Sequence, residues 1–395
     1  MNRLKIYNGQ LITPYRLISN GTVLVDENGV ITAVEEGDVQ ASAEVEIDAA
    51  GKFVSPGFID LHVHGGGGAD FMDGNVEAFL QVAKTHATYG TTALVPTTLT
   101  SENEDLIETF HIYEEAFVQN REGAHFLGLH LEGPYFSMGQ RGAQDPRYIR
   151  NPKPEEYTGI LERYGHLIAR WSAAPELPGA IEFAQCLKEY GILPAIAHTD
   201  AVYEDVIKAF ENGYTLATHL YSGMSGVTRR NAHRYAGVIE SAFLIDEMDV
   251  EVIADGIHLP APFLKLIYKI KGSEHIALVT DAMRGAGMPE GDSILGGLRN
   301  GLKVVIEGGV AKLPDRTSFA GSVATTDRLI RSMIQLADVP LLEAVKMLTL
   351  NPARIMGIGD KKGTLQKGKD ADIILFDNNI TIEKTIVEGR VIYSK

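Results

Sequence analysis

The sequence predicts a (β/α)8 barrel of the TIM type together with a small β-sandwich domain formed by both chain ends. Eight short apolar runs alternate with helical segments through the middle of the chain, while both ends are rich in short strands and turns. Ligand-type polar residues stand at the ends of most of the eight runs. The 395 residues have an ordinary globular composition and are enough for one large domain or two ordinary ones.

The small domain is predicted from the similarity of the two chain ends. Residues 1–52 contain short β-like runs such as LKIYNGQLI, and DENG between two apolar runs is a tight-turn signal. The C-terminal KGKDADIILFDNNITIEKTIVEGRVIYSK has the same character. We therefore expect residues 1–54 and 356–395 to pair into one small domain, with the barrel at 55–355 inserted between them.

The barrel is predicted from the alternation of strands and helices. Segments 76–90 and 202–214 have helical spacing and a glycine near the end, where helices commonly stop. Eight strand–helix units over ~250 residues fit a barrel, although a doubly wound open sheet has the same alternation. The glycine-rich region 287–318 is too long for a plain connection and should form a hairpin before the last barrel helix. The eight apolar runs are 57–65, 90–98, 125–133, 169–176, 191–199, 214–221, 250–258 and 275–283.

Two histidines one residue apart end the first apolar run, in the stretch FVSPGFIDLHVHGGGG at 53–68. In a strand, residues i and i+2 point to the same face, so His62 and His64 can direct two imidazoles at one point. The four glycines after them would let backbone approach that point closely. An isolated HxH motif also occurs in a structural strand before a loose turn. Other residues of the chain are therefore needed to distinguish a ligand role from a structural role for these histidines.

The ends of the other runs supply that context. The carboxyl ends of barrel strands converge on one face, where such enzymes keep their active sites. Histidines and a carboxylate from different strands are the ligands that zinc-like divalent metals favour. Each residue alone would be read as a structural histidine or a helix N-cap, but their common register favours a metal site. The residues near the ends of the third, fifth, sixth, seventh and eighth runs are Glu132, His198, His219, His258 and Asp281.

A metal on this face favours hydrolysis of an amide or related bond. A bound divalent ion lowers the pKa of water from ~15.7 to about 7 and polarises a carbonyl oxygen. A nearby carboxylate then takes the proton of the water and returns it to the leaving group. Asp281 is suited to binding metal, to transferring this proton, or to both in turn. No activated serine or cysteine nucleophile is evident, because Cys186 lies in a predicted helix before the fifth run.

Charge and targeting signals exclude several classes of partner. Lys and Arg number 36 against 52 Asp and Glu, and the formal charge of −16 disfavours nucleic acid and anionic membranes. No apolar run approaches the ~20 residues that span a bilayer, and the N-terminus lacks the apolar region of a signal peptide. The single cysteine, Cys186, excludes an intrachain disulfide. We expect a cytoplasmic protein that acts on a small-molecule substrate.

Motifs spread over almost the whole chain carry a family resemblance. They are SPGFIDLHVHG, GLHLEGPYFS, RGAQDP, AHTDA, THLYSGM, IADGIH, LVTDAM, FAGS and NPARIMGIGDKKGTLQKGKDADIILFD. With them the chain resembles the amidohydrolase superfamily and, within it, the N-acetylglucosamine-6-phosphate deacetylase family. The resemblance implies hydrolysis of N-acetylglucosamine 6-phosphate to glucosamine 6-phosphate and acetate. It also implies a homodimer with one or two divalent ions per subunit, zinc being preferred over iron, manganese or cobalt.

The resemblance further assigns roles to individual residues. Asp281 matches the catalytic acid and base, His258 matches a histidine that contacts the bound sugar, and Gln144 matches a position facing the acetyl carbonyl and the metal. The matches to the family's metal ligands are Glu132, His198 and His219 for the principal ion, and His62 and His64 for a second ion that some members hold.

Two departures from the family pattern affect the predicted substrate site. Where the family usually reads THLYNAM, this chain reads THLYSGM, which places Ser222 and Gly223 in the substrate-binding segment. Where the family often has an Arg-Glu-Pro-Gly stretch that binds the sugar phosphate, this chain has the longer TRRNAHRYAG. Arg229, Arg230 and Arg234 are therefore candidates for phosphate binding, and a solvated basic loop is the alternative.

Two alternatives to this activity stay open at the level of sequence. The altered segment 222–236 suits a related amidohydrolase that acts on a different N-acyl sugar or on a cyclic amide. A non-catalytic binding protein that kept the fold is disfavoured, because the predicted ligands and Asp281 are all present. Assays with phosphorylated and unphosphorylated substrates separate these functions.

Overall fold

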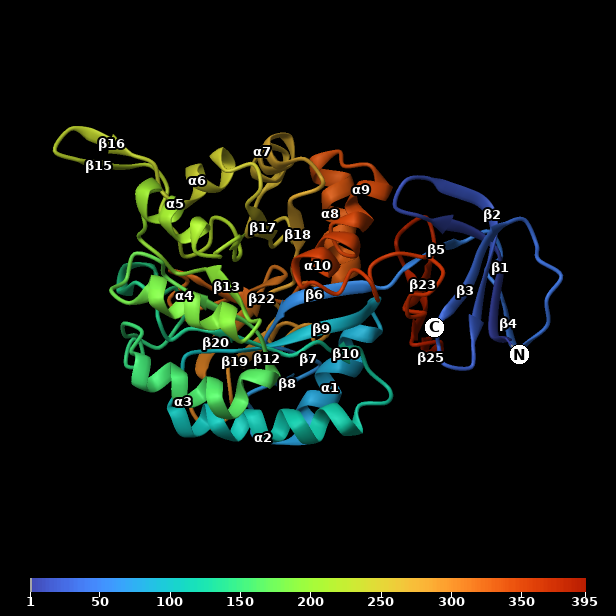
Figure 1. Cartoon of the computed structure of the whole chain (residues 1–395), viewed down its shortest axis with the longest axis horizontal. Helices are drawn as coiled ribbons and strands as arrows, with labels where there is room; N and C mark the ends of the chain where they lie inside the picture. The colour runs from blue at the N-terminus through green and yellow to red at the C-terminus, as the bar shows by residue number, and fades with distance from the viewer. Residues whose placement is uncertain (1) are drawn as a thin grey trace.

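The computed structural model describes residues 2–395 and contains the predicted barrel, with helices packed outside the strands (Figure 1). A parallel bridge between Val63 and Ala282 joins the end of the last strand to the first, a contact that an open sheet lacks. Each of the eight apolar runs supplies one strand, and a short additional strand, β10 (His125–Phe126), also pairs with β9. In spatial order the barrel strands are β6 (Phe58–Val63), β9 (Thr91–Thr98), β11 (Leu129–Glu132), β12 (Ile168–Ala173), β13 (Leu193–Ile196), β14 (Leu216–Ala217), β17 (Asp249–Val252) and β18 (Ile276–Leu278).

The helices follow the predicted spacing. Helix α1 begins after Asn75, whose side chain accepts a hydrogen bond from the backbone N–H of Ala78, and it buries one apolar face that includes Phe79 and Val82. No helix within residues 2–395 is long and apolar enough to cross a membrane. The helices are α1 (Val76–Ala87), α2 (Asn103–Gln119), α3 (Pro154–Tyr164), α4 (Ala180–Glu189), α5 (Tyr203–Glu211), α6 (Val238–Leu244), α7 (Ala261–Lys271), α8 (Thr326–Ala337), α9 (Leu341–Lys346), α10 (Leu350–Ile355) and the 3-10 turns η1 (Met138–Gln140) and η2 (Gly165–Leu167).

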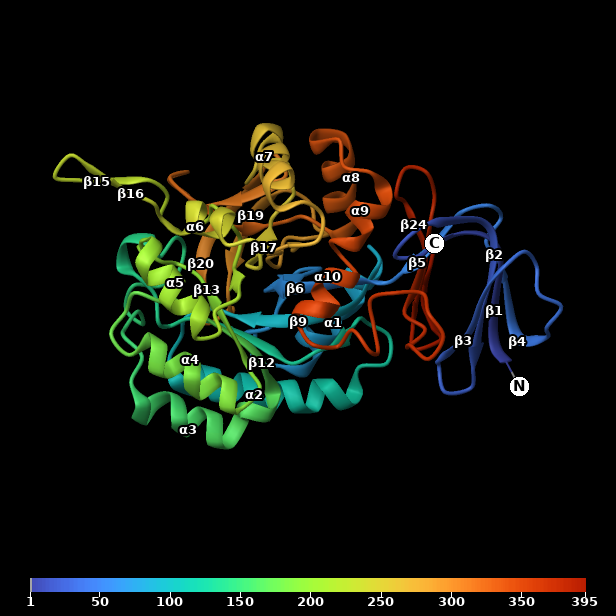
Figure 2. The ribbon, with the colours of Figure 1, turned by 45° about the horizontal axis from the view of Figure 1, so that its top comes forward.

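Both chain ends join in one eight-stranded sheet beside the barrel, as the sequence predicts (Figure 2). Its own apolar core combines residues from the two ends, such as Leu4 and Ile6 with Ile373 and Leu375. The boundaries of the β-sandwich domain at 54 and 356 stay our proposal. The strands are β1 (Asn2–Ile12), β2 (Leu17–Asp26), β3 (Ile31–Glu36), β4 (Ala43–Asp48), β5 (Phe53–Pro56), β23 (Ile373–Phe376), β24 (Ile382–Val387) and β25 (Arg390–Ser394).

The region 287–318 forms the predicted hairpin and continues into two further strands. These antiparallel strands are β19 (Gly291–Leu295), β20 (Leu302–Glu307), β21 (Val310–Lys312) and β22 (Phe319–Ser322). Leu295, Val304 and Ile306 belong to an apolar cluster that also contains Met283, two residues after Asp281. This small sheet therefore packs against the loop that follows the last barrel strand.

Two short hairpins complete the structure. The glycine run after His64 forms β7 (Gly65–Gly66), which pairs with β8 (Ala69–Asp70). The segment after the sixth barrel strand forms β15 (Thr228–Arg230) and β16 (His233–Tyr235), which project away from the barrel in both views (Figures 1 and 2).

Candidate metal centre and active site

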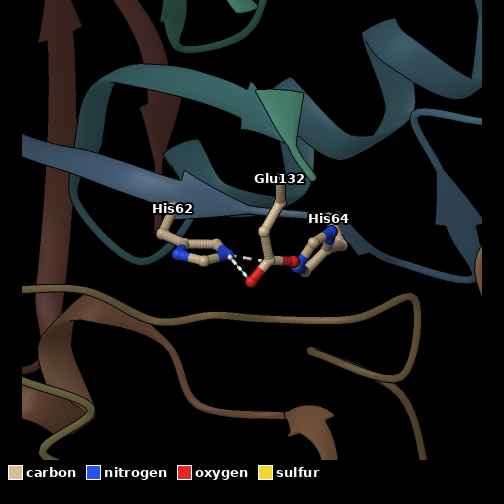
Figure 3. Close-up of side chains that lie close together, drawn as sticks. All are labelled: His62, His64 and Glu132. Atoms are coloured by element: carbon tan, nitrogen blue, oxygen red, sulfur yellow. Dashed lines mark hydrogen bonds and ion pairs between the residues drawn. The ribbon is translucent and has the colours of Figure 1, made fainter. Parts of the chain in front are cut away.

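Glu132 lies at the centre of a cluster of histidines contributed by different strands. Its Oε1 lies 3.0 Å from Nε2 of His219 and 3.1 Å from Nε2 of His198. Its Oε2 lies 3.4 Å from Nε2 of His64, and Oε1 lies 3.7 Å from Nε2 of His62. Figure 3 shows the imidazoles of His62 and His64 directed toward this carboxylate. All five side chains are buried, so the convergence predicted from strand ends is present in the structure.

The cluster suits two metal positions that share one carboxylate. Ligand atoms of Glu132, His198 and His219 lie within 4.8 Å of one another, and so do those of Glu132, His62 and His64. Within residues 2–395, all four ion-pair partners of Glu132 are histidines. Imidazole nitrogen and carboxylate oxygen are the donors that zinc and similar divalent ions take, so the residues present fit such ions.

Asp281 adds a second carboxylate to this cluster. Its Oδ1 lies 3.2 Å from Nε2 of His64 and 3.5 Å from Nε2 of His62. Burial raises the pKa of Asp281, but the neighbouring His62 and His64 outweigh it and lower the pKa below its usual value. Burial likewise lowers the pKa of His62, but Asp281 and Glu132 outweigh it and raise the pKa to about 10. The site thus attracts positive charge, and its carboxylates are ionised at neutral pH.

Three residues of the site adopt left-handed backbone conformations. The φ angles are 46° at His198, 34° at His219 and 47° at Asp281. Such values are uncommon for residues other than glycine and cost roughly 1–3 kcal/mol each, so they persist where the surrounding structure imposes them. Each of the three residues stands two or three positions after the end of a barrel strand, and this backbone conformation accompanies the inward direction of their side chains.

A buried ion pair that sequence reasoning missed supports the histidines from inside the barrel. Arg170 and Glu251 are fully buried and contact each other through Nη1 and Oε1. Burial raises the pKa of Glu251, but Arg170 outweighs it and lowers the pKa to about 2. The other oxygen of Glu251 lies 3.5 Å from Nδ1 of His62 and accepts from the backbone N–H of His219. Glu251 thus lies on the Nδ1 side of the His62 ring, while Nε2 of His62 faces Glu132; Nδ1 makes no hydrogen bond within the described residues.

A sequence signal for this ion pair existed in the apolar runs. Arg170 stands in ARWSAAPE and Glu251 in VEVIADGIH, and a charged residue within a buried strand needs a partner of opposite charge. Sequence alone does not tell which charges pair. Loss of one partner of a buried pair typically costs about 3–5 kcal/mol, so the two residues also stabilise the barrel.

Gln144 lies beside Glu132, the centre of the histidine cluster. Its Nε2 donates to Oε2 of Glu132 at 2.8 Å. Its Oε1 accepts from both the backbone N–H and the hydroxyl of Thr100 at 2.9 Å. The two hydrogen bonds from Thr100 fix the amide orientation, so the Gln144 N–H is held toward the carboxylate.

The loop that carries Gln144 is anchored by Asp200, another residue not singled out from the sequence. The carboxylate of Asp200 accepts from Ser137 Oγ and from Gln140 Nε2, both at 2.7 Å. The carbonyl of Gln140 lies 2.8 Å from Nδ1 of His198, which therefore donates to it and keeps Nε2 for the cluster. The loop and the histidine hence fix each other.

A cleft of about 350 Å³ opens above the cluster and is lined by three of the predicted substrate residues, His258, Ser222 and Gly223. His258 lies in its wall with Nδ1 donating to Asp255 Oδ2 at 2.7 Å. Ser222 and Gly223 also line the cleft. A Cβ at Gly223 would lie 2.7 Å from Nδ1 of His198, so this backbone position, with φ of 57°, requires glycine.

The three predicted phosphate-binding arginines do not lie among the residues that line this cleft. Arg229, Arg230 and Arg234 are exposed on the projecting β15–β16 hairpin. Arg230 stacks over the ring of Tyr235 at 5.3 Å within the same hairpin. The longer TRRNAHRYAG segment forms a two-stranded extension, which carries these side chains outward rather than over their own barrel.

The glycine run after the HxH pair packs closely beside the site, in agreement with the prediction. The backbone N–H groups of His64 and Gly65 both donate to the carbonyl of Ala282 at 2.8 Å. A Cβ at Gly65 would lie 2.4 Å from the carbonyl oxygen of Ala69 and 2.8 Å from the nitrogen of Arg284. Glycine therefore lets this loop contact the segment after Asp281.

Known proteins resemble this chain over most of its length. The amidohydrolase family model matches residues 53–392. N-acetylglucosamine-6-phosphate deacetylase of Lysinibacillus sphaericus is 35% identical over 89% of both chains, and that of Bacillus subtilis is 32% identical over 97% of this chain and 95% of the relative. An N-acetylgalactosamine-6-phosphate deacetylase of Escherichia coli O157:H7 is 31% identical over 92% of this chain and 93% of the relative.

Solved structures give the same result. N-acetylglucosamine-6-phosphate deacetylase from Pasteurella multocida superposes with a TM-score of 0.91 at 27% identity, over 100% of both chains. A mutant of the Mycobacterium smegmatis enzyme in complex with N-acetyl-D-glucosamine-6-phosphate superposes with a TM-score of 0.90 at 27% identity, also over 100% of both chains. The amidohydrolase superfamily is metal-dependent, which agrees with the ligand cluster around Glu132. The chain therefore belongs to the amidohydrolase family and, within it, to the N-acetylglucosamine-6-phosphate deacetylases.

Proposed function

We propose that this protein hydrolyses the N-acetyl group of N-acetylglucosamine 6-phosphate and releases glucosamine 6-phosphate and acetate. The observation that carries the proposal is the buried cluster of four histidines around Glu132, with Asp281 beside it on the floor of a cleft. The relatives named for this reaction extend over nearly the whole chain, which supports the same substrate class.

We assign the metal ligands as the sequence predicts. Glu132, His198 and His219 would hold one divalent ion, and His62 and His64 would hold a second that shares Glu132. Zinc is our preferred ion, with iron, manganese and cobalt as alternatives, because the donors are imidazole and carboxylate. When bound, such an ion lowers the pKa of water and polarises a carbonyl oxygen.

Asp281 is the proposed proton carrier. As an ionised carboxylate beside the cluster, it takes one proton from the attacking water while the water oxygen bonds to the acetyl carbon. It then gives that proton to the amide nitrogen as the carbon–nitrogen bond breaks, which yields the amine and acetate. Gln144 is held where its amide can orient the acetyl oxygen, and His258 presents its free Nε2 toward the sugar.

N-acetylgalactosamine 6-phosphate is the second candidate substrate. The relative from Escherichia coli O157:H7 that is named for this sugar is 31% identical, close to the 35% of the Lysinibacillus sphaericus relative. The departures at Ser222 and Gly223 lie in the wall of the cleft, where the sugar would be distinguished. Other N-acyl sugars and cyclic amides stay wider alternatives.

Acetate release provides the direct test. Purified protein should release acetate from N-acetylglucosamine 6-phosphate with a higher kcat/KM than from the galactosamine epimer or from unphosphorylated N-acetylglucosamine. Metal content should be measured on the same sample. A preference for the epimer would move the assignment to the second candidate, and absence of acetate release from all three sugars by metal-replete protein would refute the deacetylase proposal.

We further propose a homodimer in which the β15–β16 hairpin reaches a second copy of the chain. An isolated two-stranded hairpin is only marginally stable in water, so an exposed one benefits from a partner. Helix α7 also presents Phe263, Leu266 and Ile270 on its outer face, with exposed fractions of 41%, 42% and 45%. Residues at this i, i+3, i+7 spacing form an apolar stripe of the kind that helices bury against a partner.

In this arrangement an arginine of the hairpin would bind the sugar phosphate in the neighbouring subunit. Arginine suits phosphate because its planar group donates two parallel hydrogen bonds. Alanine at the responsible position among Arg229, Arg230 and Arg234 should raise KM for the phosphorylated sugar about 10- to 100-fold, the equivalent of a charge-assisted contact. Activity on the unphosphorylated sugar should stay unchanged.

One control measurement accompanies these arginine variants. Oligomeric state should be measured by light scattering for each variant, since loss of the dimer would lower activity for a different reason. Equal losses on both sugars would mean that the hairpin shapes the site without binding phosphate. Unchanged kinetics in all three variants would mean that the arginines do not bind the phosphate and that the hairpin is a solvated basic segment.

We also place the protein in the cytoplasm as a proposal. Its only cysteine, Cys186, is free and half-buried, so the fold does not depend on an oxidising compartment. Fractionation of the producing cells, with activity measured in each fraction, tests this location.

A further inference from the structure

An apolar wall separates the cleft from a second, smaller chamber of about 70 Å³. Four residues line both cavities. One is Gln144, and the other three are Leu99, Ala143 and Leu295, which belong to or pack against one apolar cluster. They come from three distant segments, namely the end of β9, the loop before Gln144 and the end of β19. The wall is therefore a feature of the tertiary structure that has no single sequence motif.

The wall adjoins the groups that hold Glu132. Ala143 precedes Gln144, whose amide donates to Glu132 Oε2 at 2.8 Å. Leu99 precedes Thr100, which accounts for both hydrogen bonds to the Gln144 oxygen. Two of the three wall residues, Leu99 and Ala143, are therefore direct sequence neighbours of the Thr100–Gln144 pair that holds Glu132.

The two sides of the cleft have different chemistry. Leu99 and Ala143 follow β9 and β11, the second and third strands of the barrel, whereas Ser222 and His258 follow β14 and β17, the sixth and seventh. In a ring of eight strands these two pairs face each other across the mouth. The cluster around Glu132 therefore lies between the side with Leu99 and Ala143 and the side where Ser222 and His258 supply polar groups next to the rings of Tyr221 and Phe319.

This arrangement orients an N-acyl substrate. Its carbonyl carbon must lie at the cluster, and the two substituents of that carbon point in different directions. The sugar nitrogen suits the polar side with His258, because a sugar phosphate needs hydrogen-bond partners. The acyl substituent then points at the apolar side, where Leu99, Ala143 and Leu295 meet it.

We propose that Leu99, Ala143 and Leu295 form an acyl stop, which seats the methyl group of the acetyl substituent and rejects longer acyl chains. This inference rests on the proposed function, because it takes an N-acyl amino sugar as the substrate. The chamber behind the wall would lengthen the acyl-binding site, but the side chains of Leu99, Ala143 and Leu295 block the way into it. Opening the wall would extend the substrate range to N-propionyl and N-butyryl groups.

The chamber restricts which acyl groups would enter. Asp105 and Glu108 line it, and Arg299 lies with Nη1 3.2 Å from Oε2 of Glu108. Asp73 and Asp145 also line the chamber, but Arg284 and Arg147 pair with them, which leaves Asp105 as the lining carboxylate without an ion pair within residues 2–395. This remaining negative charge disfavours acyl chains that end in a carboxylate, such as succinyl, so the expected ligands are uncharged short alkanoyl groups.

Leu295→Ala and Leu99→Ala test the acyl stop. The measured quantity is kcat/KM for N-acetyl, N-propionyl and N-butyryl glucosamine 6-phosphate. One surplus methylene in a closed apolar pocket costs roughly 10- to 200-fold in discrimination, so the unmodified protein should lose at least ~10-fold per added methylene. In each variant the ratio of butyryl to acetyl kcat/KM should rise at least ~10-fold over that of the unmodified protein.

Leu313→Ala is the matched control. Leu313 packs against the same apolar cluster but lines neither cavity, so its truncation should leave the chain-length ratio unchanged. Because Leu99 is only half-buried, Leu99→Ala should disturb folding less than Leu295→Ala does, so it still tests the proposal if Leu295→Ala folds poorly. An unchanged ratio in folded Leu99→Ala and Leu295→Ala proteins would overturn the proposal, and so would an equal change in Leu313→Ala.

A binding experiment separates this inference from the proposed function. Dissociation constants of the acetyl and butyryl sugars should be measured by calorimetry in an Asp281→Asn background, with and without Leu295→Ala. Absence of turnover of the acetyl sugar by the unmodified protein would count against the proposed function. A Kd ratio that fails to shift toward the butyryl sugar in the Leu295→Ala protein would count against the acyl stop.

Discussion

The Asp281→Asn substitution should lower kcat for deacetylation by about 100- to 10,000-fold, the usual contribution of a general acid–base group. Asparagine keeps the shape of the side chain and removes the carboxylate that would accept the proton. The backbone at this position has φ of 47°, a conformation that asparagine adopts more readily than most residues. The fold and the cluster around Glu132 should therefore survive. Steady-state kinetics on the acetyl sugar with metal-replete protein measures the loss.

Asp338→Asn is a matched control for this experiment. Asp338 also has a left-handed backbone, with φ of 57°, but it follows α8 at an exposed position, where it pairs with Lys265. Its substitution should leave turnover unchanged. Near-normal turnover of folded, metal-loaded Asp281→Asn protein would contradict the role of Asp281.

Removal of a metal ligand should have the second large effect. His198→Ala deletes one of three ligands of the proposed first ion and should lower metal affinity by more than the 10- to 100-fold typical of residues outside the coordination sphere. Turnover should fall with the metal. His62→Ala should release only part of the metal, because the set of Glu132, His198 and His219 stays complete. Metal content after gel filtration, measured by mass spectrometry, gives the stoichiometry of each variant.

His166→Ala serves as the control for the ligand variants. His166 is exposed and distant in sequence from every strand end of the site, so both metal content and turnover should match the unmodified protein. Full metal occupancy in His198→Ala protein would refute the ligand assignment. Equal and complete loss of metal in His62→Ala and His198→Ala would mean that the two positions fill only together.

The sequence by itself determined the elements and the residue types of the site. The apolar runs became strands because each is short, apolar and followed by a helical segment, and those features act within a few residues. The HxH pair was identifiable because alternation along a strand fixes the face that His62 and His64 share. Glu132, His198, His219 and Asp281 were identifiable because the barrel brings the carboxyl ends of its strands to one face.

The tertiary structure alone decided which groups meet. The pairing of Arg170 with Glu251 joins β12 to β17, and the wall of Leu99, Ala143 and Leu295 joins three segments; no local pattern encodes either contact. The basic composition of the β15–β16 segment likewise does not predict that the hairpin projects away from the barrel. Local periodicity reflects backbone geometry over one or two turns, whereas these contacts depend on how distant segments pack around one core. Side chains that are remote in the sequence therefore become neighbours only when the barrel closes.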